Sequence, residues 1–183
     1  LATGLDALTQ ATEAYWSKHT NSLVQDVAYR AIHLVLENLP LLLKNLNNIN
    51  LRTKLARASL LAGVAFSNTR TTACHSISYP LTLLYNIPHG LAVALTLESV
   101  LRINMRHFKN YQELNNLFST YGGLKSWLDK TTKGIVEMRL SYFGIEKKDI
   151  PTIVDNAFTG GRMDNNPVDL TKKDVTRILL NVL

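Results

Sequence analysis

The sequence of 183 residues contains only one cysteine, Cys74. A single thiol excludes an intramolecular disulfide framework and any zinc site built from several cysteines. Scarce cysteine is typical of a reducing compartment, so we expect a cytoplasmic protein. We interpret Cys74 as a small buried residue. Neighbours in a helix point about 100° apart, so joint coordination of a metal with His75 is not expected.

Long apolar runs are absent as well. No stretch of about 18 or more uninterrupted apolar residues occurs, which argues against a transmembrane helix and any membrane partner. The segment 1–18 lacks a basic start followed by an apolar run, so no signal peptide is expected. The chain begins without methionine. We therefore expect it to be one part of a longer protein.

Glycine-rich phosphate-binding motifs are also missing. Neither GxGxxG nor GxxxxGK[ST] occurs, and the glycine pairs 122–123 and 160–161 follow no predicted strand. We do not expect this stretch alone to bind a dinucleotide in the βαβ manner.

The net charge of +6 comes from 20 basic and 14 acidic residues. The basic residues are scattered, and the densest groups are the pairs 147–148 and 172–173. This pattern favours a solvated basic surface over a nucleic-acid footprint. A basic helical module that binds nucleic acid or a protein partner, without a metal, remains the alternative from the binding class.

Apolar residues recur at helical spacing along nearly the whole chain, and no convincing alternation of strand type is present. The sequence predicts an all-α helical bundle that forms a single domain over residues 1–183. The predicted helices cover residues 6–18, 22–39, 51–66, 72–84, 88–104, 112–120, 124–142 with an interruption at Gly134, 149–158 and 171–182.

Local signals define several helix ends. Pro40 is expected to end the second helix, and Pro88 is expected in the first turn of the fifth. Thr171 and Asp174 resemble a capping box at the start of the last helix. The fifth helix is apolar nearly all round, which predicts a central, buried position.

The residues most suited to chemistry are His75 and His89, fourteen positions apart and each near the start of a predicted helix. Two such helices can bring both imidazoles to the bundle interior, where they could bind zinc or iron. Asp6 and Gln10 share one face of the first helix. Asp6 beside the two histidines would complete a metal site with open positions. The alternatives are hydrogen-bonded core histidines and an aspartate favoured by the helix dipole.

The order of motifs is specific. DALTQAxEAY occupies 6–15, AG with FSN occupies 62–68, His75 leads to PL at 80–81, and YNxPHG occupies 85–90. This order, with NNP at 165–167, resembles the C-terminal helical domain of the iron-containing alcohol dehydrogenases, whose fold is dehydroquinate-synthase-like. In complete members of that family, an N-terminal α/β domain binds NAD(P). The active site lies in the cleft between the two domains.

The resemblance implies one divalent metal, usually Fe²⁺ and sometimes Zn²⁺, held by Asp6, Gln10, His75 and His89. Gln10 departs from the family pattern, which has histidine there. An amide oxygen is a poorer ligand than imidazole for either metal. The departure could lower metal affinity, change the preferred metal or mark a loss of metal. Three strong ligands could also suffice, as in glycerol dehydrogenases and dehydroquinate synthases, which gives an alternative enzyme class.

The implied reaction is reversible hydride transfer between NAD(P) and a small alcohol or aldehyde, with the metal as Lewis acid. Tyr79 replaces a histidine found in many members. It could act catalytically as a proton donor to the developing alkoxide, although packing is favoured. The stretch 68–82 resembles the phosphonoacetaldehyde reductase branch, in which a basic residue precedes the metal histidine. Arg70 could therefore bind a phosphonate substrate, or it could be a surface arginine. The family also implies a possible homodimer, and we expect no activity from this chain without the nucleotide-binding domain.

Overall fold

Helices account for all the regular structure, as the spacing of apolar residues predicts, and the chain forms no strand. The computed structural model describes residues 1–183. Three 3-10 turns, Leu140–Phe143, Lys147–Asp149 and Met163–Asn165, join some of the helices. The nine α-helices are α1 (Ala2–Trp16), α2 (Ser22–Lys44), α3 (Ile49–Thr69), α4 (Ala73–Tyr85), α5 (His89–Asn104), α6 (Tyr111–Thr120), α7 (Leu124–Thr132), α8 (Ile150–Asn156) and α9 (Lys172–Asn181).

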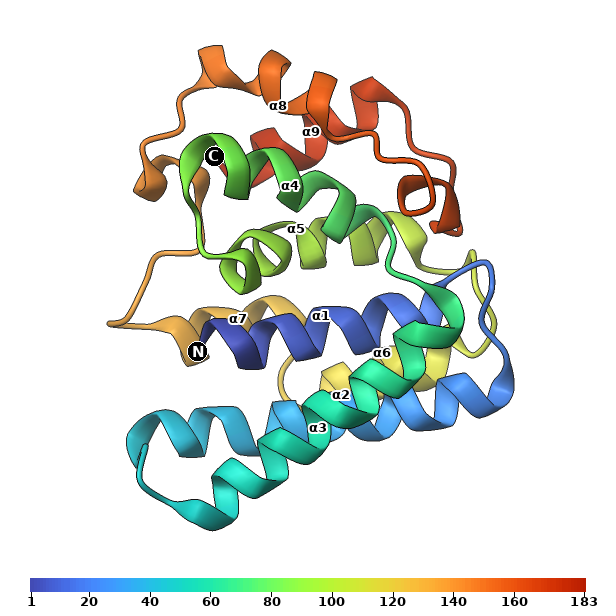
Figure 1. Ribbon diagram of the computed structural model, residues 1–183, viewed down its shortest axis with the longest axis vertical. Coiled ribbons are helices and arrows are strands. Elements are labelled where there is room, and N and C mark those ends of the chain that lie inside the picture. The colour runs from blue at the N-terminus through green and yellow to red at the C-terminus, as the bar shows by residue number, and fades with distance from the viewer.

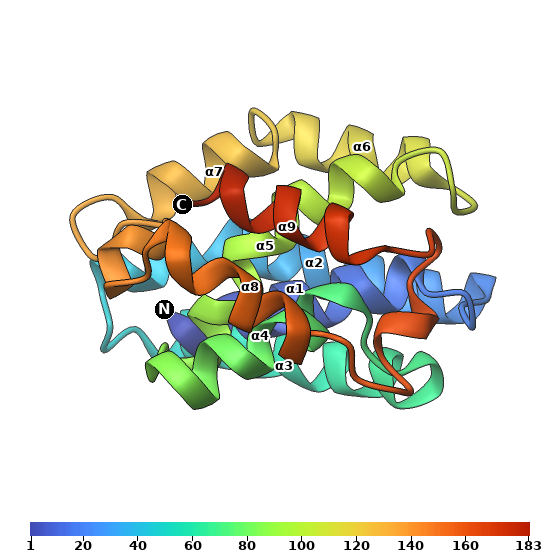
Figure 2. The ribbon, with the colours of Figure 1, turned by 90° about the horizontal axis from the view of Figure 1, so that it is seen from above.

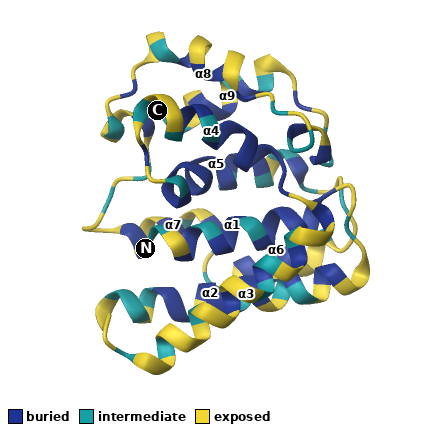
Figure 3. Cartoon of the chain, in the orientation of Figure 1, coloured by how far each residue is buried: buried dark blue, intermediate teal, exposed yellow.

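Helices α1 and α5 lie side by side through the middle of the molecule (Figure 1). Helices α2 and α3 pack on one side of this pair, and α4, α8 and α9 cover the other. Seen from above, α6 and α7 run along one edge (Figure 2). Burial follows this arrangement, because α1 and α5 are mostly buried whereas α3 has a broad exposed face (Figure 3). The prediction that the helix of residues 88–104 is central is confirmed.

A glycine sets the close approach of α1 and α5. A Cβ atom added to Gly90 would lie only 1.9 Å from the backbone oxygen of Ala2. Only glycine therefore allows the first turns of the two helices to meet at this distance. The contact brings the start of α5, with His89, to the first turns of α1, which carry Asp6.

Pro40 does not end the second helix, which continues to Lys44. Proline lacks the N–H that would bond to the carbonyl four residues earlier, that of Leu36. In the structure Trp127 Nε1 donates to this Leu36 oxygen at 2.9 Å. A side chain from α7 thus takes the place of the missing backbone donor, and the helix tolerates the proline.

The predicted helix over residues 124–142 is also wrong in its second half. Helix α7 ends at Thr132, and Gly134 adopts a φ of +77°. The backbone N–H of Leu140 then donates to Val182 O at 2.6 Å. The chain leaves the helix to pair with the end of α9, a long-range contact that local spacing does not encode.

The helix starts differ from the predictions in one place that matters for the site. The first helix begins at Ala2 rather than Asp6, so Asp6 lies in its second turn and is not a first-turn acid. At the other end of the chain, the predicted capping box of Thr171 and Asp174 is present.

Candidate metal centre

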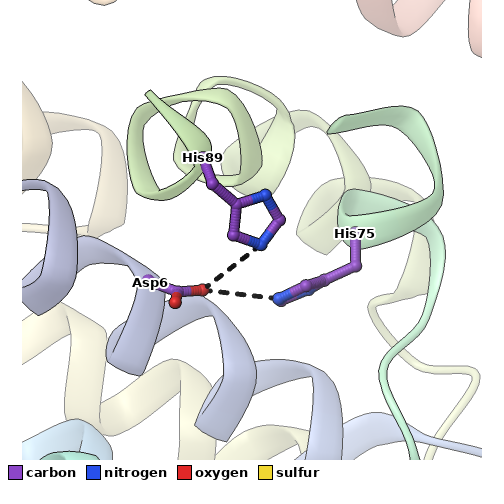
Figure 4. A group of neighbouring side chains, drawn as sticks. All are labelled: Asp6, His75 and His89. Carbon is purple, nitrogen blue, oxygen red and sulfur yellow. Dashed lines mark ion pairs between the residues drawn. The ribbon is translucent and has the colours of Figure 1, made fainter. Parts of the chain in front are cut away.

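Three helices bring Asp6, His75 and His89 together (Figure 4). Asp6 comes from the second turn of α1, and the two histidines come from the first turns of α4 and α5. Asp6 Oδ1 lies 3.4 Å from Nε2 of His75 and 3.9 Å from Nε2 of His89. One ligand atom from each residue lies within 4.8 Å of the others. Spacing alone leaves hydrogen-bonded core histidines and a dipole-favoured aspartate as alternatives, and the resemblance to the family implies that these three residues share one site.

Two atoms of this group are buried without a hydrogen-bond partner, Asp6 Oδ1 and His75 Nε2. Buried polar atoms are nearly always hydrogen-bonded, so an unpaired acceptor facing an unpaired imidazole nitrogen is an exception that calls for a ligand. One carboxylate oxygen and two imidazole nitrogens are a donor set that zinc and ferrous iron accept, with positions left for a substrate. The residues present therefore fit a divalent metal.

Glu13 holds His75 in the orientation that such a site needs. Its carboxylate is completely buried, and Oε2 lies 2.5 Å from Nδ1 of His75. When Nδ1 donates its proton to this carboxylate, the lone pair of Nε2 faces Asp6. A carboxylate behind a histidine in this way is typical of metal-binding imidazoles.

The charges of these residues depend on one another. Burial opposes the charged form of Glu13, but the charge of His75 and the hydrogen bonds outweigh it and hold the pKa of Glu13 below its usual range. Burial likewise opposes the charge on His75, but the carboxylates of Glu13 and Asp6 raise the pKa of His75 to about 9. Burial and the nearby His75 lower the pKa of His89. A cation at Nε2 would replace the proton that these carboxylates favour.

Glu13 also caps helix α4, which has no capping side chain of its own. Its two carboxylate oxygens accept hydrogen bonds from the backbone N–H groups of Thr72 at 3.0 Å and Cys74 at 2.6 Å. The hydroxyl of Thr72 donates to Oε1 at 2.8 Å and accepts from Trp16 Nε1 at 2.8 Å. An acid from α1 thus binds the positive end of α4 and, in the same turn, the ring of His75.

Sequence reasoning missed this role of Glu13. The residue appears there only as a letter of the family motif, although a signal was available. Asp6, Gln10 and Glu13 are spaced by four and three residues, which places three polar side chains on one helix face. Such a row on a helix otherwise rich in buried apolar residues indicates a polar site.

Gln10 lies one turn after Asp6, and its Nε2 donates to Asp6 Oδ2 at 3.2 Å. A role for Gln10 as a fourth metal ligand remains a prediction. The contact that the structure gives it is with the second oxygen of the carboxylate, where it restrains the rotation of Asp6.

Tyr79 and Cys74 flank His75 on α4 and differ in their surroundings. The ring of Tyr79 stacks on that of His89, with centroids 6.4 Å apart and planes 21° apart. Cys74 is fully buried, as predicted, and burial together with Glu13 raises the pKa of its thiol. This thiol is therefore unsuited to act as a nucleophile.

A cavity of about 430 Å³ opens beside this group. It is lined by Gln10, Phe66, Ser67, Arg70, Thr71, His75, Tyr79, Gly161 and Arg162. Arg70 and Tyr79, for which contact with the substrate is one of the two interpretations of the sequence, thus line the same cavity as a candidate metal ligand. A larger cavity of about 820 Å³ lies among α5, α7 and α9 and includes none of these residues.

Known proteins are similar to this chain along its whole length. The family model for the C-terminal part of the Fe-containing alcohol dehydrogenase family matches residues 1–183. The 1,3-propanediol dehydrogenase of Klebsiella pneumoniae is 33% identical over 97% of this chain and 49% of its own length. The NAD-dependent methanol dehydrogenase of Bacillus methanolicus is 29% identical over 100% of this chain and 51% of its own.

Solved structures share the fold. The sulfoacetaldehyde reductase of Bifidobacterium kashiwanohense, solved in complex with NAD⁺, superposes with a TM-score of 0.86 at 28% identity. The match covers 99% of this chain and 49% of that one. The chain therefore spans about half the length of the relatives it matches. No helix of the structure combines the length and the apolar character needed to cross a membrane.

Proposed function

The chain belongs to the Fe-containing alcohol dehydrogenase family, as its C-terminal domain, and on this basis we propose that it is the metal-binding half of an NAD(P)-dependent alcohol dehydrogenase or aldehyde reductase. The observation that carries the proposal is the meeting of Asp6, His75 and His89, with two unpaired buried ligand atoms. The NAD⁺ complex of the sulfoacetaldehyde reductase and the NAD-dependent methanol dehydrogenase support the choice of cofactor.

Asp6, His75 and His89 would hold Fe²⁺ or Zn²⁺. When bound, such a metal supplies a Lewis acid for the oxygen of the alcohol or aldehyde. The protein's own contribution is orientation. Glu13 holds His75 through Nδ1, and Gln10 holds Asp6 through Oδ2. Both contacts keep the ligands in place before the substrate arrives.

Tyr79 would act at the substrate side of this group. Its ring packs on His89 and its side chain lines the cavity. The phenol Oη would donate a proton to the oxygen of the substrate as the aldehyde is reduced. If Tyr79 only packs, Tyr79→Phe will leave kcat and its pH profile unchanged, because the stacked ring is retained.

The rest of the proposal concerns the whole enzyme. The hydride carrier NAD(P) would bind to the other half of the protein, so the chain of 183 residues alone is expected to show no aldehyde reductase activity. The substrate would be a small alcohol or aldehyde, and Arg70 would contact an anionic group on it, such as a phosphonate. A cytoplasmic location and a homodimer belong to the same proposal.

A second candidate function is a three-ligand enzyme of the glycerol dehydrogenase or dehydroquinate synthase type. One observation favours it, because Gln10 occupies the position of the fourth ligand and contacts Asp6 instead. Measuring activity of the full-length protein with alcohols, glycerol and a heptulosonate phosphate separates the two classes.

Metal analysis of the full-length protein tests the ligand set. We expect about one metal per chain in the wild type and a large loss in His75→Ala. The exposed His19 provides the control, since His19→Ala removes an imidazole outside the site. Full metal content in His75→Ala would refute the ligand assignment.

A further inference from the structure

Two guanidinium groups line the cavity beside His75. Arg70 follows the end of α3, and Arg162 lies in the loop between α8 and the turn Met163–Asn165. No aspartate or glutamate lines this cavity. Neither arginine has an acidic partner within 4 Å, so the two positive charges are not neutralised by the chain.

The larger cavity among α5, α7 and α9 shows the opposite arrangement. It is lined by Arg102, Lys125, Arg139 and Arg177. Each of these has an acidic partner, in the pairs Arg102–Glu98, Lys125–Asp129, Arg139–Glu137 and Arg177–Asp174. The cavity beside His75 is therefore distinct in its unbalanced positive charge, which favours an anionic occupant.

The side chain of Arg70 reaches the loop of Arg162 from a strained backbone position. Arg70 has a φ of 60° and a ψ of 174°, a conformation that is almost confined to glycine and is strained in other residues. Its Nη1 lies so close to Gly161 that a Cβ atom there would stand 2.9 Å away. A glycine thus makes room for the guanidinium next to Arg162, while a strained arginine is kept where glycine would fit better.

Arg162 is connected to the candidate metal centre through Tyr79. Its guanidinium carbon lies 5.0 Å from the centre of the Tyr79 ring, and this ring stacks on His89. A guanidinium held by a cation–π contact keeps its N–H donors available for hydrogen bonds. Arg162 is thereby placed at the cavity without using the donors that would bind a ligand.

We propose that Arg162, together with Arg70, binds the tetrahedral oxyanion of a small aldehyde or alcohol whose reacting oxygen lies at Asp6, His75 and His89. Each guanidinium fork binds a pair of oxygens. The three oxygens of a phosphonate, phosphate or sulfonate can present such pairs to two separate forks, whereas a carboxylate has a single pair. The cavity volume of about 430 Å³ fits a molecule of this size. The part of this inference that concerns the reaction rests on the proposed function, whereas the binding of the anion does not depend on it.

The first experiment uses the full-length enzyme and measures kcat/KM for 2-oxoethyl phosphonate, 2-oxoethyl sulfonate and the neutral propanal. We expect the wild type to prefer at least one of the anionic aldehydes. Arg162→Ala should reduce the preference over propanal by about tenfold or more, as expected for the loss of a charged hydrogen-bonding partner. Arg162→Lys should restore part of it, because it keeps the charge and loses the fork. The control Arg57→Ala, on the exposed side of α3, should leave the preference unchanged.

The second experiment does not depend on activity. Calorimetry with the full-length protein compares the unreactive ethylphosphonate, ethanesulfonate and propionate, with the folding of each variant checked by its melting temperature. We expect a tetrahedral anion to bind more tightly than propionate, and Arg162→Gln to weaken it by about tenfold. Equal binding of all three anions, or equal binding by Arg162→Gln and Arg57→Ala, overturns the proposal. If the enzyme reduces no aldehyde, this experiment still decides the anion site by itself.

Discussion

The carboxylate of Glu13 contacts Nδ1 of His75 at 2.5 Å, which ties the first helix to the candidate ligand of the fourth. Replacing the acid by its amide removes the charge while keeping the shape. We expect Glu13→Gln to lower the affinity for Zn²⁺ or Fe²⁺ by about 10–100-fold, because the imidazole loses the partner that fixes its orientation and basicity. Competition with a chelator of known affinity measures this change.

The control for this prediction is Asp26→Asn, which alters an exposed acid on α2. Urea unfolding of the metal-free protein provides a second, independent measurement, the free energy of unfolding. The backbone N–H groups of Thr72 and Cys74 would lose a charged acceptor, so the free energy of unfolding should fall by about 1–3 kcal/mol. Unchanged metal affinity in Glu13→Gln would show that Glu13 serves only to cap α4.

Gln10→His tests whether the glutamine weakens the metal site. The imidazole would lie one turn after Asp6 and would add a fourth strong ligand, so we expect the metal affinity to rise by about tenfold or more. Gln10→Ala should lower it modestly through the loss of the hydrogen bond to Asp6. Chelator competition measures both variants. No gain in Gln10→His would mean that position 10 does not reach the metal.

The contact between Gly90 and Ala2 predicts a strong effect of one methyl group. Gly90→Ala should lower the free energy of unfolding by about 3 kcal/mol, since α1 and α5 would have to separate. The metal affinity should fall with it, because His89 would move away from Asp6. Gly63→Ala is the matched control. Its added Cβ would meet nothing within 4 Å, and within α3 it should stabilise the protein by about 0.5–1 kcal/mol.

Trp127 and Pro40 form a pair that a double-mutant cycle can measure. Trp127→Phe leaves the Leu36 oxygen without its donor. We expect the free energy of unfolding to fall by about 1–3 kcal/mol beyond the effect of the changed packing. In a Pro40→Ala background the backbone N–H of residue 40 is restored and the extra cost should disappear. If Trp127→Phe lowers the free energy of unfolding equally in both backgrounds, as measured by urea unfolding, this explanation of the tolerated proline is wrong.

Arg70→Gly should change stability and substrate selectivity in opposite directions. Glycine relieves the strained backbone, so we expect a gain of about 1 kcal/mol in the free energy of unfolding. The selectivity for anionic over neutral aldehydes should fall. Arg70→Ala separates the two effects, because it removes the guanidinium but keeps a side chain in the strained conformation. A loss of stability in Arg70→Gly would show that the side chain is held for structural reasons.

Local patterns predict the helices, and the short connection between the fourth and fifth helices predicts that His75 and His89 can meet. The place of Asp6 beside them is predicted by the resemblance of the motifs to the family, because spacing alone leaves Asp6 as an aspartate favoured by the helix dipole. Contacts between distant segments escape such reasoning. The end of the second helix is misjudged because Trp127, far along the chain, replaces the donor that Pro40 lacks. Arg162 goes unnoticed for the same reason, since only the folded chain places it beside Tyr79.

Because one carboxylate serves both the start of α4 and the ring of His75, position 13 is a poor choice for redesigning metal preference. Any substitution at position 13 that is intended to make the imidazole a weaker or stronger ligand also removes the acceptor that caps the first turn of α4. Variants selected for a new metal are therefore expected to change at Gln10, whose side chain makes its hydrogen bond to Asp6, and to leave Glu13 intact.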